Sequence, residues 1–232
     1  MFMKTILLKM GGVTASLVSV LAFATPAQSL TFTTFTDETA FRSAAGSLST
    51  ETFNSFTADA SFNNGVTVNL ADFSLTGFGN STGFGSRNLI DVSPFNASIV
   101  NINGTPFVLG ITQSGIGFNT TFNSPITAFG ATFNGTSDFA PNRLRVGDDV
   151  VGNLPVISEG GNGFFGFIAN GSFATLTFDI PTGAGADAFG ADNFLYSSSA
   201  TPVPFEFSPA LGVGALGGLW TAKRLIKKSK NN

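Results

Sequence analysis

The sequence predicts an all-β domain, a jelly-roll-like β-sandwich with one short helix near its N-terminus, and three observations point to it. Short segments alternate apolar and polar residues, which is the pattern of strands with one buried face. Asn-Gly pairs recur between those segments and indicate tight turns. The 232-residue chain has 27 phenylalanines and no cysteine. The domain must therefore be stabilised by the packing of large apolar rings and not by disulfides.

The alternation of apolar and polar residues is clearest at residues 174–180, and it recurs at 129–133 and 66–70. Residues 144–151 predict a β-hairpin whose turn is Gly147-Asp148-Asp149. Further turns are predicted at four Asn-Gly pairs, which begin at Asn64, Asn103, Asn134 and Asn170.

One short helix is predicted near the start of the domain. Thr36 can cap a helix that has acidic residues in its first turn and that ends at Gly46. Phe41, together with Ala44 or Ala45, would face the sheet. The remaining charged residues are too sparse for a second layer of helices.

The two ends of the chain are predicted to be targeting segments and not parts of the domain. Residues 1–29 have a basic start, an uncharged apolar stretch and small residues before Ser29, which is the layout of a cleaved signal peptide. Residues 30–196 would then form the exported β-sandwich. A polar linker covers residues 197–203, and residues 204–232 form a C-terminal hydrophobic helix with a basic tail.

The charges are divided unequally along the chain. The segment 30–208 has four arginines, no lysine and all 14 acidic residues, and so a net charge of −10. Such a body repels phosphate backbones, and we expect no nucleic-acid partner. The end of the chain carries five basic residues, Lys223, Arg224, Lys227, Lys228 and Lys230. Basic residues that follow a membrane-inserted segment stay in the cytoplasm, which would leave the acidic body outside.

The C-terminal apolar run is short for a membrane helix. Residues 210–222 alone would reach about 20 Å, less than the roughly 30 Å of a bilayer core, and adding residues 205–209 makes the length marginal. Small residues recur every four positions in this run, at Ala210, Gly214, Gly218 and Ala222. On a helix they would form a stripe that lets another membrane helix approach closely. The alternative, that glycine and alanine are simply abundant in weak spans, stays open.

The order of parts at this end, a short Pro- and Glu-containing motif, a weak apolar helix and a basic tail, resembles the PEP-CTERM class of bacterial protein-sorting signals. It looks most like the Pro-Phe-Glu variant of cyanobacterial exoproteins. The motif residues, which stand where the main class has Pro-Glu-Pro, are Pro204, Phe205, Glu206, Ser208 and Pro209. The resemblance implies recognition by an exosortase-type membrane protease, cleavage near the motif and delivery to the cell surface or matrix.

The body also resembles the jelly-roll ectodomains that are often joined to such tails. The residues that carry this resemblance are the glycine- and aromatic-rich segments 125–130, 163–167 and 192–196. The resemblance implies the fold, and it implies no activity, because those ectodomains mostly have none assigned.

The excess of carboxylates suits a hard cation such as calcium, which prefers oxygen ligands. By position, Glu51 near the first strands and Asp192 with Asn193 near the last strand are the candidate ligands. In the alternative interpretation, Asp192-Asn193 forms a turn and Glu51 is solvated.

Several enzyme classes are excluded by composition. The chain has no histidine or cysteine, so it has no imidazole-activated nucleophile and no zinc finger. A glycoside hydrolase needs two carboxyl groups roughly 5–10 Å apart, and no such pair stands out among the scattered residues Asp59, Asp72 and Asp138. The only tyrosine on which a sugar could stack is Tyr196. We therefore expect a non-enzymatic surface or matrix protein, attached to exopolysaccharide. The alternatives are a calcium-dependent carbohydrate-binding module and then a glycoside hydrolase.

Overall fold

The computed structural model describes residues 29–79, 88–92, 100–102, 104 and 106–197. The predicted signal peptide and the C-terminal sorting signal, with nearly all of the linker, lie outside these residues. In the part of the chain that is described, no helix has the length and apolarity to cross a membrane.

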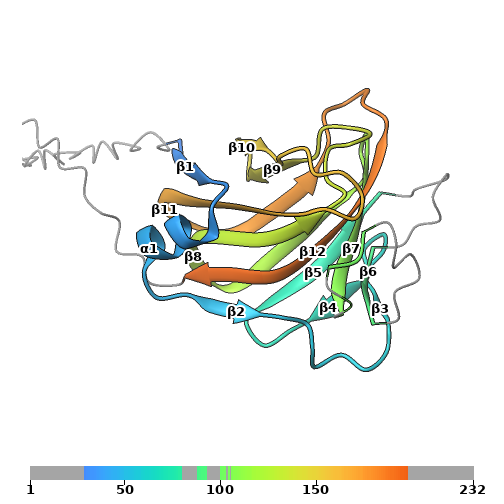
Figure 1. Cartoon of the computed structure of the whole chain (residues 1–232), viewed down its shortest axis with the longest axis horizontal. Coiled ribbons are helices and arrows are strands. Elements are labelled where there is room, and N and C mark those ends of the chain that lie inside the picture. The colour runs from blue at the N-terminus through green and yellow to red at the C-terminus, as the bar shows by residue number, and fades with distance from the viewer. Residues whose placement is uncertain (1–28, 80–87, 93–99, 103, 105, 198–232) are drawn as a thin grey trace, which may run out of the picture.

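The described residues form twelve β-strands and one short α-helix, so the predicted mostly β domain with a short N-terminal helix is confirmed (Figure 1). The elements are β1 (Phe32–Phe35), α1 (Glu38–Ala45), β2 (Ser49–Glu51), β3 (Ala60–Ser61), β4 (Thr67–Asn69), β5 (Phe73–Phe78), β6 (Leu89–Asp91), β7 (Phe107–Gln113), β8 (Gly117–Asn134), β9 (Arg143–Val146), β10 (Asp149–Asn153), β11 (Asn162–Asp179) and β12 (Ala186–Ser197).

The strands belong to one large antiparallel sheet. Its main order is β10-β9-β11-β8-β12-β7-β6-β3; β1 pairs with β11, β2 with β12, β5 with β8, and β4 with β5. The long strands β8 and β11, with 18 residues each, run side by side through the middle of the molecule (Figure 1). The N-terminal half of β8 pairs with β5 and its C-terminal half pairs with β12. The two halves of β8 therefore hold different parts of the sheet around a shared core.

Phenylalanine fills this core, as the sequence predicts. In the described part of the chain, the largest fully buried side chains are all phenylalanines. Phe118 and Phe178 stack with their ring centroids 4.4 Å apart, and Phe194 contacts Phe53 edge-to-face. Buried rings contribute a few kcal/mol each, and edge or offset contacts add to that.

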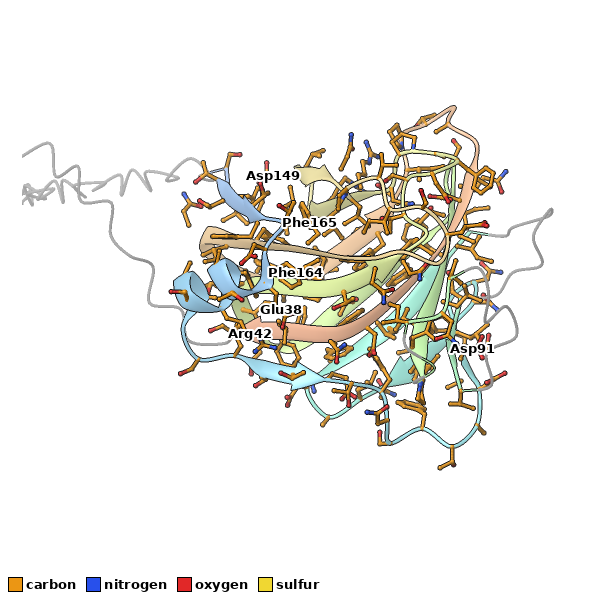
Figure 2. The ribbon with its side chains drawn as sticks, viewed as in Figure 1. Glu38, Arg42, Asp91, Asp149, Phe164 and Phe165 are labelled. Atoms are coloured by element: carbon orange, nitrogen blue, oxygen red, sulfur yellow. The ribbon has the colours of Figure 1, made fainter. Side chains whose placement is uncertain are left out.

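The helix α1 covers a smaller cluster on the other face of β11. Phe41 and Ala45 are buried, as predicted, and the ring of Phe41 packs against Phe164. The neighbouring side chain, Phe165, belongs to the main core, so successive residues of β11 supply both clusters (Figure 2). This is the alternation expected of a strand that is covered on both faces.

The predicted cap of α1 is wrong by one residue. Asp37, not Thr36, is the N-cap, and its carboxylate accepts a hydrogen bond of 2.7 Å from the backbone N–H of Ala40. The negative charge of aspartate at this position also interacts favourably with the positive end of the helix dipole. Gly46 ends the helix at a φ of 75°, as predicted.

Two of the predicted turns are confirmed and one is wrong. At a fourth, Asn134 ends β8 and Gly135 has a positive φ, and Asn103 of the fifth lies outside the described residues. Asn64-Gly65 forms a turn with both φ angles positive, and the strands β9 and β10 form the predicted hairpin. Asn170-Gly171, in contrast, lies inside β11, where the register with β8 shifts between Ile168 and Phe173. The pair therefore marks a β-bulge, which bends a strand without ending it.

The two ends of the domain lie on one row of the sheet. Thr33 of β1 pairs with Ile168, Ile168 pairs with Ala128, and Ala128 pairs with Ser197 of β12. Adjacent strands are about 4.8 Å apart, so Thr33 and Ser197 are separated by about 14 Å across the sheet. The chain thus enters and leaves the domain on the same side of the molecule, beside the middle of the long strands β8 and β11 (Figure 1).

The first described residues are also held to the sheet by an acidic side chain. The carboxylate of Asp149, at the start of β10, accepts hydrogen bonds from the hydroxyl of Ser29 at 2.9 Å and from the N–H of Leu30 at 3.0 Å. Figure 2 shows Asp149 beside the start of β1. The domain boundary that the sequence predicts at residue 30 is thus a point of contact with the sheet.

Candidate functional site

A hollow of about 200 Å³ lies beside the C-terminal part of β12. Its floor is formed by the buried side chains Phe122, Ile126 and Tyr196. Its rim is polar and exposed, and consists of Ser49, Asp72, Asn123 and Ser124. An apolar floor with a few convergent polar groups is the usual composition of a small-ligand site.

The hollow forms where β8 bends. Phe122 pairs with β5 and Ile126 pairs with β11, while the residues between them have no partner in these ladders. Pro125 lies in this stretch and has no backbone N–H to donate, so regular pairing is interrupted there. The β4–β5 turn fills one side of the gap, because Asn123 donates from its backbone N–H to the carbonyl of Asp72 at 2.9 Å and from Nδ2 to the carbonyl of Ala71 at 2.9 Å.

Asp72 and Tyr196 are joined across this hollow. The Tyr196 hydroxyl donates a hydrogen bond of 2.8 Å to Oδ2 of Asp72. Its ring is fixed by contacts with Phe73 and Phe122. Burial raises the pKa of Tyr196 above its ordinary value, and the hydrogen bond to Asp72 and the negative charges of Asp72 and Glu51 raise it further. The phenol therefore stays protonated and acts as a hydrogen-bond donor at physiological pH.

The charges near the hollow are negative. Asp72 and Glu51 both act on Tyr196, and in the described part of the chain the arginines are engaged elsewhere. Arg42 pairs with Glu38 on α1, and the two arginines of β9 both pair with Asp179. A carboxylate, sulfate or phosphate in the hollow would thus meet like charge without a compensating base.

A second polar cluster lies at the opposite end of β12 and is buried. Asp187 is 3% exposed, and its Oδ2 accepts hydrogen bonds from the N–H of Ser137 at 2.8 Å and from Nδ2 of Asn142. Oδ1 of Asn142 accepts from the hydroxyl of Thr112. Burial raises the pKa of Asp187 to about 7, and the neighbouring carboxyl of Asp138 raises it as well, against the lowering effect of Ser137 and Asn142.

This raised pKa predicts a pH-dependent stability. Between the ordinary aspartate pKa of 3.8 and about 7, folded Asp187 keeps a proton that the unfolded chain has released. The free energy of unfolding should therefore decrease as the pH rises through this range, by as much as a few kcal/mol at about 1.4 kcal/mol per pKa unit. Urea unfolding measured from pH 4 to pH 8 checks the direction.

The variant Asp187→Asn removes the titrating group and should flatten this decrease. Asp148→Asn is the matched control, because Asp148 is exposed in the β9–β10 turn, and it should keep the wild-type slope. An equal slope in wild type and Asp187→Asn would show that other groups cause the pH dependence.

The predicted calcium ligands are brought to neighbouring strands. β2 pairs with β12 so that Glu51 lies opposite Phe194. Oε1 of Glu51 accepts from the N–H of Phe53 at 2.6 Å, and Oδ1 of the buried Asp192 accepts from the N–H of Asn193 at 2.6 Å. Asn193 has a φ of 52° at a register shift within β12, so the pair forms a bulge and not a turn.

Calcium binding by Glu51, Asp192 and Asn193 stays a prediction. Among the residues described, no group of three or more acidic side chains is placed to hold a metal ion. The sorting motif, the small-residue stripe and the basic tail lie outside the described residues.

The sequence did not indicate either polar cluster. Asp72 and Asp138 look isolated along the chain, yet Asp72 meets Tyr196 from 124 residues away and Asp138 lies next to Asp187. Neither contact has a periodicity or a motif that could have revealed it. The sequence indicates Tyr196 as a residue on which a sugar could stack, because it is the one tyrosine, but it does not indicate the contact with Asp72.

Comparison of the chain with models of protein families, with curated proteins and with solved structures finds no match.

Proposed function

We propose that the protein is an exported, non-enzymatic component of the cell surface or extracellular matrix of a bacterium. Its domain would be jelly-roll-like, with β8 and β11 bending between two layers of strands. A PEP-CTERM-type signal would hold it in the membrane until an exosortase-type protease cleaves near Pro204-Phe205-Glu206. The displayed domain would then associate with exopolysaccharide.

The observation that carries this proposal is the shared row of Thr33 and Ser197. A C-terminal tether that starts at Ser197 would hold the domain at the end of β12, beside the middle of the long strands β8 and β11. The loops that follow β8 and precede β11, which include the exposed side chains of Phe139 and Val156, would then face away from the membrane. The acidic, lysine-free body and the basic tail support the same orientation.

The burial of Asp187 supports a non-enzymatic role. Asp138 lies close enough to raise the pKa of Asp187, but Asp187 is 3% exposed. A glycosidase acid and its partner must both reach the scissile bond of a substrate, and a side chain buried under the Ser137–Asn142 loop does not. Incubation of the producer's exopolysaccharide with the protein should release no new reducing ends, and a steady release would contradict this part of the proposal.

Localisation is tested on whole cells. Protease added to intact cells should digest the domain, and mass spectrometry of protein from cells and medium should show a mature N-terminus at Leu30. A variant in which the five basic residues of the tail are replaced by glutamine should lose membrane retention. Protection of the domain in intact cells, followed by digestion after lysis, would overturn the proposal.

A further inference from the structure

We infer that the hollow at Asp72 and Tyr196 binds one neutral sugar ring, such as a hexose within a polysaccharide, without a metal ion. This inference does not depend on the sorting signal, because binding is a property of the folded domain.

The size of the hollow selects a single ring. Its volume of about 200 Å³ is below the range of about 300–1,000 Å³ that is typical for drug-sized ligands. The hollow is open at the surface, since four of its lining residues are exposed. A ring seated there can therefore remain connected to a longer chain on the solvent side.

The lining matches the two kinds of surface on a sugar. One face of a hexose consists largely of C–H groups, which suits the floor made by Phe122, Ile126 and the ring of Tyr196. The edge of a hexose carries hydroxyls that both donate and accept. Asp72 offers only acceptors, whereas Asn123 and Ser124 can supply donors and acceptors.

The acceptor at Asp72 is held in place before any ligand arrives. Tyr196 donates to Oδ2, and Asn123 binds the backbone of the same turn at two points. Because Tyr196 binds Oδ2, the other carboxylate oxygen of Asp72, Oδ1, can accept a hydrogen bond from a ligand hydroxyl. A group that is already oriented loses little entropy when the ligand binds.

The charge of the hollow excludes acidic sugars. Asp72 and Glu51 lie close enough to Tyr196 for both to act on its phenol, and the arginines in the described part are paired with Glu38 or Asp179. A uronate or sulfated sugar would therefore be repelled.

The test measures binding of neutral methyl hexosides and of glucuronic acid to the purified protein in the presence of EDTA. Saturation-transfer NMR should show contact with at least one neutral hexoside and none with glucuronic acid. Asp72→Asn should weaken that binding about ten-fold or more, because a hydrogen bond to a charged acceptor is lost. Tyr196→Phe keeps the ring and its packing, and should weaken binding by a smaller factor because Asp72 is no longer oriented.

Asp148→Asn, an exposed carboxylate on another hairpin, is the control and should bind as the wild type does. Circular dichroism of each variant verifies that it is folded. The inference would be overturned if the wild type bound none of the neutral hexosides, if glucuronic acid bound equally well, or if Asp72→Asn bound like the control. Binding that appears only when calcium replaces EDTA would also overturn it, and would favour the calcium-dependent alternative.

Discussion

Replacing Phe178 by alanine should lower the free energy of unfolding by about 3–5 kcal/mol. The side chain is 1% exposed and stacks on Phe118, with further ring contacts to Phe129, Phe133 and Phe189. Its removal leaves a cavity between β8 and β11 that these rigid rings cannot fill. The total free energy of unfolding of a domain of this size is roughly 5–15 kcal/mol, so the variant should retain little stability. Urea unfolding followed by circular dichroism measures the loss.

Phe139→Ala is the matched control for this change. The same side chain is deleted, but Phe139 is 75% exposed, so the free energy of unfolding should change by less than about 0.5 kcal/mol. If both variants lost similar stability, the stacked core would not be the dominant source of stability.

Replacing Gly117 by alanine should be at least as damaging, although it adds a single methyl group. A Cβ at this position would lie 2.0 Å from the carbonyl oxygen of Phe178. Because that oxygen belongs to the backbone of the neighbouring strand, relief would require the two central strands to separate locally. We expect a loss of about 3 kcal/mol or more, at the upper end of the cost of overpacking, measured by thermal or urea unfolding.

Gly185→Ala tests the same change in open space. No atom lies within 4 Å of a Cβ built at Gly185, and its φ is not in the positive region. Alanine should be neutral there or should stabilise the protein slightly by restricting the unfolded chain. A similar loss in both variants would indicate a general intolerance of alanine and not the close strand contact at Gly117.

The parts of the fold that follow from local patterns were predictable. The alternation at residues 174–180 predicts a strand, and residues 174–179 do lie in β11. Their burial does not alternate, because both faces of β11 are covered from Leu176 onward. The burial of phenylalanine follows from the cost of exposing large rings. Neither needs knowledge of which strands meet.

Features that depend on pairing between distant segments were not predictable in the same way. Asn170-Gly171 looks like any other turn pair, and only the continuing ladder on both sides makes it a bulge. The Asp72–Tyr196 contact depends on the bend of β8 that places the β4–β5 turn beside β12.

The capping residue of α1 was missed by one position because threonine and aspartate are both good N-caps, and only the geometry distinguishes them.

The position of Ser197 at the end of β12 has a mechanical consequence. β12 lies between β8 on one side and β7 and β2 on the other. Tension that reaches the domain through Ser197, while the far end is held, would pull along β12 and load its flanking ladders in shear. Many backbone hydrogen bonds would then resist together, in contrast to a peripheral strand that peels away one bond at a time.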